Sequence, residues 1–184
     1  MDWHKIKSGY QIKGYTLIEL LVSLLIAAIL LGLSLPSFQD TIESSVTNSQ
    51  VKLLMTTLNL ARSEAIKRGT EVAICASDDS VDCDAGVWSD GWIVFVDNNG
   101  DADGDDGSID AGDVVIRVFD ALGANSVLTS SFDLFEYNEL GFGETGGVQT
   151  LKICPSSDNA ANARSIEISV SGRGRRIEDG LVCP

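Results

Sequence analysis

Histidine is almost absent from this sequence. The one residue of this type is His4, in a short basic segment that we expect to be removed, so the remaining chain has none. Catalysis by a Ser-His or Cys-His pair needs an imidazole as general base, and many metal centres need one as a ligand. The sequence therefore argues against these classes and predicts that the protein is not an enzyme.

Positive charge is also scarce. Thirteen lysines and arginines stand against 27 acidic residues, which gives a formal net charge of −14. The first fourteen residues carry Lys5, Lys7 and Lys13 against Asp2, so their removal leaves a net charge of −16. Such a surface repels polyanions, and any contact with nucleic acid therefore needs a local basic patch.

Charge of either sign is missing from Leu20 to Leu35. A secretory signal peptide is cut after its apolar stretch, whereas here a basic leader, residues 1–14, precedes that stretch. We expect cleavage after Gly14, which would leave an apolar helix over residues 15–36. This length reaches the roughly 20 residues that a bilayer span needs, and the basic leader predicts a cytoplasmic N-terminus.

Glu19 stands near the start of the apolar stretch. A carboxylate within lipid costs about 2.5–3.5 kcal/mol, so a partner is expected. One interpretation is a boundary residue that reaches the lipid headgroups. The other is pairing with the free amine that cleavage creates on Tyr15.

The residues from Gly14 to Val22 resemble the class III signal of type IV pilins and type II secretion pseudopilins. The resemblance implies that a prepilin peptidase cuts after Gly14 and methylates the amine of Tyr15, a position where phenylalanine is usual. It implies that Glu19 assists docking into a filament, and Pro36 falls where these pilins commonly have a kinking proline. The resemblance also implies that the protein crosses the bacterial inner membrane once, with its domain in the periplasm. After assembly with other pilins it would lie in a pilus or pseudopilus.

A helical period continues beyond this segment. Apolar residues recur at helical spacing: Phe38, Ile42 and Val46, then Leu54, Leu58, Ala61 and Ala65. Gly69 after two basic residues predicts the end of the helix. We expect one long helix with a transmembrane first half, whose amphipathic second half, residues 37–69, packs on a sheet.

Short β-type runs separated by turn residues fill residues 70–184. They are Glu71–Ala76, Trp92–Val96, Val114–Phe119, Gln149–Cys154, Ser165–Val170 and roughly Arg176–Val182. No helical period returns among them. The sequence predicts an α+β pilin fold, with the helix packed on antiparallel β-sheets.

The run from Trp88 to Asp97 narrows the resemblance. It is similar to the GspH/FimT/FimU group of minor pilins and pseudopilins, in which a Trp-Gly-Trp strand precedes an acidic turn. We expect its tryptophans to be core residues rather than catalytic ones.

Four cysteines lie in the domain expected outside the cytoplasm, where an even number indicates two disulfides. Three pairings are possible. We favour Cys75–Cys83, which closes the loop between them, and Cys154–Cys183, which holds the C-terminus to a strand. No CxxC pattern exists, which argues against zinc binding and thiol redox catalysis.

The acidic loop that begins at Asn99 has the spacing of an EF-hand. The candidate calcium ligands are Asn99, Asp101, Asp103, Asp105 and Asp110. Asp110 is shorter than the usual glutamate, and no helix pair flanks the loop. A solvated hairpin turn is therefore the alternative interpretation, and no other cofactor is expected.

Three arginines lie within four residues of the segment Gly172–Arg176, and Arg164 and Lys152 are candidates for the same patch. Arginine grips phosphate with parallel hydrogen bonds. The Gly-Arg-x-Arg pattern resembles the C-terminal motif of FimT-type pilins that bind DNA in natural transformation. The resemblance implies phosphate contacts from Arg173 and Arg175, with added charge from Arg176.

Two functions follow from these resemblances. The first is a minor pilin, assembled into or priming a type IV pilus, that binds double-stranded DNA through the arginines. The second is a GspH-type pseudopilin of type II secretion without DNA binding, in which the Ser-Gly-Arg turn only connects two strands.

Overall fold

The computed structural model describes residues 14–83, 87–98, 109, 112–144, 146–178 and 180–183, and gives no side chains for residues 33–37. The chain divides into two compact units, Met1–Gln39 and Asp40–Pro184. The acidic residues predicted to bind calcium lie outside the described residues.

The long helix α1 (Leu17–Arg68) contributes to both units. In the first unit its described apolar side chains are exposed, from Leu17 to Leu31. Among the residues that the structure describes, no helix is both long enough and apolar enough to cross a membrane.

In the second unit, α1 buries one stripe of side chains. The buried apolar residues follow a three-and-four spacing: Val51, Leu54, Leu58, Ala61 and Ala65. Phe38 and Ile42, at the start of the predicted stripe, are more than half exposed. Burial of the helix in this unit begins at Thr47, the first buried residue among those whose exposure is described. A fragment that begins at Asp40 therefore retains the whole described core and is expected to fold alone.

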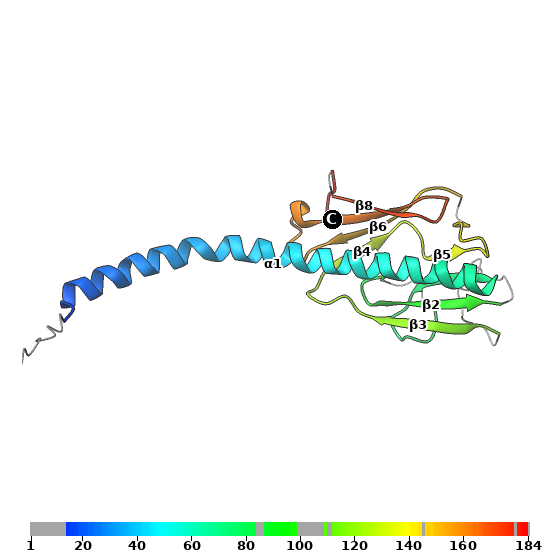
Figure 1. The fold of residues 1–184 in the computed structure, drawn as a ribbon, viewed down its shortest axis with the longest axis horizontal. Coiled ribbons are helices and arrows are strands. Elements are labelled where there is room, and N and C mark those ends of the chain that lie inside the picture. Colours follow the sequence, from blue (N-terminus) through cyan, green and yellow to red (C-terminus); the bar gives the residue numbers. More distant parts are fainter. Residues whose placement is uncertain are drawn as a thin grey trace, which may run out of the picture. The chain divides into compact units, whose positions relative to one another are not determined.

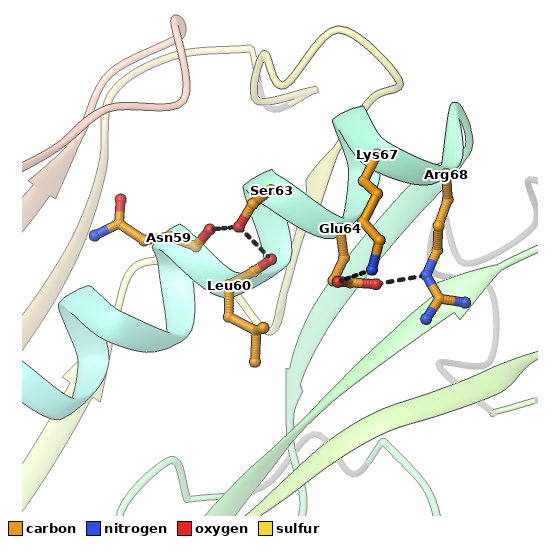
Figure 2. A network of polar contacts seen from close by, with 6 residues as sticks. All are labelled: Asn59, Leu60, Ser63, Glu64, Lys67 and Arg68. Carbon is orange, nitrogen blue, oxygen red and sulfur yellow. Dashed lines mark hydrogen bonds and ion pairs between the residues drawn. The ribbon is translucent and has the colours of Figure 1, made fainter.

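The C-terminal end of α1 is stabilised by charge. The Glu64 carboxylate accepts a hydrogen bond from Arg68 Nε at 2.7 Å and from Lys67 Nζ at 3.2 Å, as Figure 2 shows. The bond from Arg68, followed by that from Lys67, holds the pKa of Glu64 below its ordinary value of 4.5. Ser63 donates to the carbonyls of Asn59 and Leu60 one turn earlier. The helix stops at Gly69, whose φ of +67° favours glycine, as the sequence predicts.

Two four-stranded antiparallel sheets complete the second unit, and Figure 1 shows α1 running along both. Sheet A has the order β3-β2-β1-β5, and sheet B has the order β4-β6-β7-β8. The strands of sheet A are β1 (Glu71–Ala76), β2 (Gly91–Asp97), β3 (Val114–Asp120) and β5 (Leu134–Tyr137). Those of sheet B are β4 (Val127–Ser130), β6 (Gln149–Cys154), β7 (Arg164–Ile168) and β8 (Gly174–Ile177). A short 3-10 helix, η1 (Ala160–Asn162), precedes β7.

The predicted α+β architecture is confirmed, with differences in detail. The strands β4 and β5 are not among the predicted runs, because each has only four residues and lies among serines and aspartates. The last predicted run is wrong in position, since β8 ends at Ile177.

One continuous core joins the helix to both sheets. Trp92 in β2 is fully buried, stacks on Phe119 at 5.3 Å between ring centroids, and donates from Nε1 to Thr57 Oγ1 on α1 at 3.2 Å. The other face of sheet A holds a second, smaller cluster that includes Ile93 and Phe95. Because β2 is covered on both faces, all seven of its residues are buried.

Both favoured disulfide pairings are present. Cys75–Cys83 joins β1 to the loop that follows it, and Cys154–Cys183 joins β6 to the C-terminal segment. The described chain contains no free cysteine. Lys152 adds a second tie to this segment by donating from Nζ to the Val182 carbonyl at 2.8 Å.

Candidate functional site

The hairpin between β7 and β8 positions the predicted arginines. We call residues Ser169–Arg173 the arginine turn. Its backbone is closed by bonds from Gly172 N to Ser169 O at 2.8 Å and from Ser169 N to Arg173 O at 3.0 Å. The described part of the chain therefore presents Arg173 and Arg175 on either side of Gly174, at the start of an edge strand.

Glycine is required at position 172. Its φ is +72°, and a Cβ built there would lie 2.8 Å from Cε1 of Tyr137 and would also meet the Gly141 carbonyl. The buried Tyr137 hydroxyl donates to the Gly172 carbonyl at 3.2 Å. Burial raises the pKa of this phenol far above its ordinary value, so it remains a donor across the physiological range. The arginine turn is thus held on Tyr137 of sheet A.

The three arginines of the motif have different surroundings. No described residue forms a hydrogen bond or ion pair with the guanidinium of Arg173, which is exposed. The Arg175 side chain is 72% exposed and lies 3.2 Å from Glu167 Oε1, its cross-strand neighbour. Arg176 turns to the opposite face, contacts Asn48 on α1, and has its Nε 2.8 Å from Glu178 Oε1. The structure thus separates Arg176 from the other two.

Two further candidate cations do not join the arginine turn. Arg164 is buried and donates to the carbonyls of Ala161 and Ala163 at 2.9 and 2.7 Å. The Lys152 amine donates a hydrogen bond to the Val182 carbonyl. The prediction that Arg164 joins the basic patch is therefore wrong, because its side chain faces the interior near η1. The same prediction for Lys152 gains no support.

A second turn, which the sequence interpretation missed, lies against the arginine turn. In residues 138–143, Asn138 Oδ1 accepts from the amides of Leu140 and Phe142 at 3.1 and 3.0 Å. Gly143 N donates to the Val170 carbonyl at 3.1 Å, which fastens the two turns together. The Asn138, Gly141 and Gly143 spacing is a local signal for a turn, but no local signal reveals which hairpin it meets.

Helix α1 also reaches this place. Arg62 donates from Nε to the Gly141 carbonyl at 2.9 Å. Both turns and the C-terminal end of α1 consequently lie at one end of the second unit, as the ribbon shows for the β7–β8 hairpin and the helix end (Figure 1).

The calcium hypothesis gains no support from the described residues. They contain no group of three His, Cys, Asp or Glu side chains suited to a metal ion. Beside the acidic loop, Asn98 bonds to Asp113 Oδ1 through its amide at 3.1 Å and to the Gly112 carbonyl through Nδ2 at 2.6 Å. The residues that flank the loop are thereby held together.

The N-terminal signature occupies the start of α1. Gly14 and Tyr15 precede the helix, and Thr16 Oγ1 accepts from Glu19 N at 3.3 Å, in the manner of an N-cap. Glu19 is exposed in the first turn, where a carboxylate complements the helix dipole. Pro36 lies within α1, in the stretch whose side chains are not described.

Comparisons with known proteins agree with these features. The family model of the type II transport protein GspH matches residues 50–174, and that of the prokaryotic N-terminal methylation motif matches residues 11–35. No curated protein sequence matches the chain significantly.

Two kinds of solved structure have a similar fold. A crystal structure of the type IV minor pilin FimU of Pseudomonas aeruginosa matches with a TM-score of 0.58 and 21% identity, covering 74% of this chain and 92% of that one. The minor pseudopilin EpsH of the Vibrio cholerae type 2 secretion system matches with a TM-score of 0.50 and 14% identity, covering 73% and 98%. At these identities the likeness shows the fold alone.

Proposed function

The chain belongs to the GspH family of minor pilins and pseudopilins, and we propose that it serves as a minor subunit of a type IV pilus. The observation that carries this proposal is the presence of a methylation motif and a GspH domain on one chain. The role is structural rather than enzymatic, in keeping with a mature sequence without histidine.

We propose that a prepilin peptidase cuts after Gly14 and methylates Tyr15. The uncharged run Leu20–Leu35 would then hold the subunit in the inner membrane until assembly. In the filament, the exposed Glu19 carboxylate would meet the new amine of a neighbouring pilin, an ion pair that lipid or a filament core would strengthen.

Replacing Glu19 with leucine is expected to leave cleavage intact but to reduce the amount of subunit in sheared filaments at least about tenfold, because the loss of a desolvated ion pair costs well over 1.4 kcal/mol. Immunoblots of filament and membrane fractions measure the effect, and mass spectrometry of the N-terminus reports cleavage and methylation. Asp40→Asn, an exposed acidic position on the same helix, is the matched control. Incorporation of Glu19→Leu at the wild-type level would contradict the assembly role.

We further propose that the arginine turn binds DNA. The guanidinium of Arg173, which has no partner among the described residues, supports this, as does the exposure of Arg175 just beyond the turn. With two phosphate contacts the binding would be weak, independent of sequence and strongly dependent on salt. Arg176 would add only to the local potential, since Glu178 lies 2.8 Å from it.

Alanine at both Arg173 and Arg175 is expected to weaken duplex DNA binding by the Asp40–Pro184 fragment about tenfold or more at low salt. The slope of log affinity against log salt should also fall by about 1–2, since each phosphate contact contributes about 0.9. Mobility shifts over a salt series measure both quantities. Arg117→Ala, an exposed arginine on β3, should bind as the wild type does. Unchanged binding by the double variant would remove the assignment to this turn.

A GspH-type pseudopilin of type II secretion is the second candidate, favoured by the description of the matching family. In that role the arginine turn would only connect β7 to β8. The absence of DNA binding by the wild-type fragment, with the gene among secretion genes, would select this function.

A further inference from the structure

An exposed apolar patch adjoins the arginine turn. Its members are Ile66 at the end of α1, Leu140 and Phe142 in the second turn, and Val170 in the arginine turn, with 47–66% of each residue exposed. We call these four residues the apolar patch. Exposed apolar side chains that gather in one place are typical of interaction sites.

Backbone contacts between the two turns bring this patch next to Arg173. Gly143 N bonds to the Val170 carbonyl, and a Cβ on Gly172 would meet the Gly141 carbonyl, so the backbones of the two turns touch. Phe142 directly follows Gly141, and Arg173 directly follows Gly172. Consecutive Cα atoms are about 3.8 Å apart. The backbone positions of Phe142 and Arg173 therefore lie within the reach of one or two nucleotides.

The two turns are also fixed in place. The Tyr137 hydroxyl donates a hydrogen bond to the Gly172 carbonyl, and Arg62 on α1 donates one to the Gly141 carbonyl. The ring and the guanidinium are consequently presented by a framework that needs little ordering when a ligand binds.

The charges around the patch restrict how a polyanion can lie. Glu139 in the second turn and Glu144 directly after it are both exposed, and Glu144 Oε1 accepts from Asn138 Nδ2 at 3.2 Å. These carboxylates repel phosphate on the Phe142 side, whereas Arg173 attracts it on the other. A bound strand would therefore have its phosphates over the arginine turn and its bases over the apolar patch.

We propose that the ligand of this site is single-stranded nucleic acid, with one base stacked on Phe142 and its phosphate on Arg173. The inference rests on the proposed DNA binding and makes it more specific. Unstacked bases offer a face to an aromatic side chain, whereas the bases of a duplex are already stacked and paired. Phe142 therefore contributes to binding of a single strand and not of a duplex.

The test compares one oligonucleotide as a single strand and as a duplex, at fixed low salt, with the Asp40–Pro184 fragment. Phe142→Ala should weaken single-strand binding about fivefold or more and change duplex binding less than about twofold. Phe142→Trp should restore single-strand binding, because it restores an aromatic face. Val118→Ala, an exposed apolar position on β3, is the control. Melting temperatures show that each variant is folded.

The outcomes separate the two proposals. If the Arg173 and Arg175 variant loses binding while Phe142→Ala binds single strands normally, stacking is overturned and the proposed function stands. If Phe142→Ala weakens both forms equally, the ring acts on the shape of the turn and stacking is again overturned. If the wild-type fragment binds neither form, both proposals fail, and the apolar patch is then free for a protein partner.

Discussion

Replacing Trp92 with alanine is expected to lower the free energy of unfolding of the Asp40–Pro184 fragment by about 3–5 kcal/mol, the range for large aromatic side chains removed from a core. Trp92 is fully buried, stacks on Phe119 and bonds to Thr57 on α1. Its removal leaves a cavity where the helix meets sheet A. The Thr57 hydroxyl loses the indole donor but still donates to the Leu53 carbonyl at 3.1 Å. Urea denaturation, followed by the fluorescence of the remaining tryptophan in the fragment, Trp88, measures the loss.

Thr57→Val separates the hydrogen bond from the packing. It preserves the volume beside the indole but leaves Nε1 of Trp92 buried without an acceptor, which should cost about 1–3 kcal/mol. The valine variant should therefore be less destabilised than Trp92→Ala. A loss below about 1 kcal/mol for Trp92→Ala would show that the core at this point collapses around the missing ring.

Serine at both Cys154 and Cys183 is expected to destabilise the same fragment by about 3–4 kcal/mol. The bridge closes a loop with a sequence separation of 29 residues, and the loss of this constraint raises the entropy of the unfolded chain. The paired change at Cys75 and Cys83, with a separation of 8, should cost less, about 2–3 kcal/mol. Denaturant titrations of the two double variants under the same conditions compare the losses directly.

The order of these two losses is the informative result. If the Cys75 and Cys83 variant were the less stable one, entropy would not be the main effect. The loss would then come from the smaller cluster on the outer face of sheet A, where Cys75 and Cys83 pack with Ile93 and Phe95.

Much of the fold follows from local sequence signals. The stop at Gly69, the buried stripe from Leu54 to Ala65 and the early strands were predictable, because periodicity and turn residues act over a few positions. Phe38 and Ile42 have the same periodicity but are more than half exposed. Periodicity identifies a face of a helix without identifying what covers it.

The candidate site was predictable only in part. A cluster of arginines is visible in the sequence. That Arg176 contacts Asn48 while Arg175 contacts Glu167 depends on the register of β8 against β7. The burial of Arg164 depends on η1, which directly precedes β7, and on Ser44, which is 120 residues away in the sequence. The meeting of Gly141 with Gly172 is a tertiary contact, for which one sequence carries no local signal.

The pairing of β1 with β5 has a kinetic consequence. Val72 lies opposite Tyr137, so sheet A closes only after a long intervening segment, which includes β2 and β3, has been brought into place. Contacts this distant along the chain slow folding, because the entropy of loop closure is lost before any pairing is gained. The domain therefore remains incompletely folded until the chain as far as Tyr137 is available for pairing. Tyr137 also supports Gly172, so the arginine turn is among the last features to reach its final form.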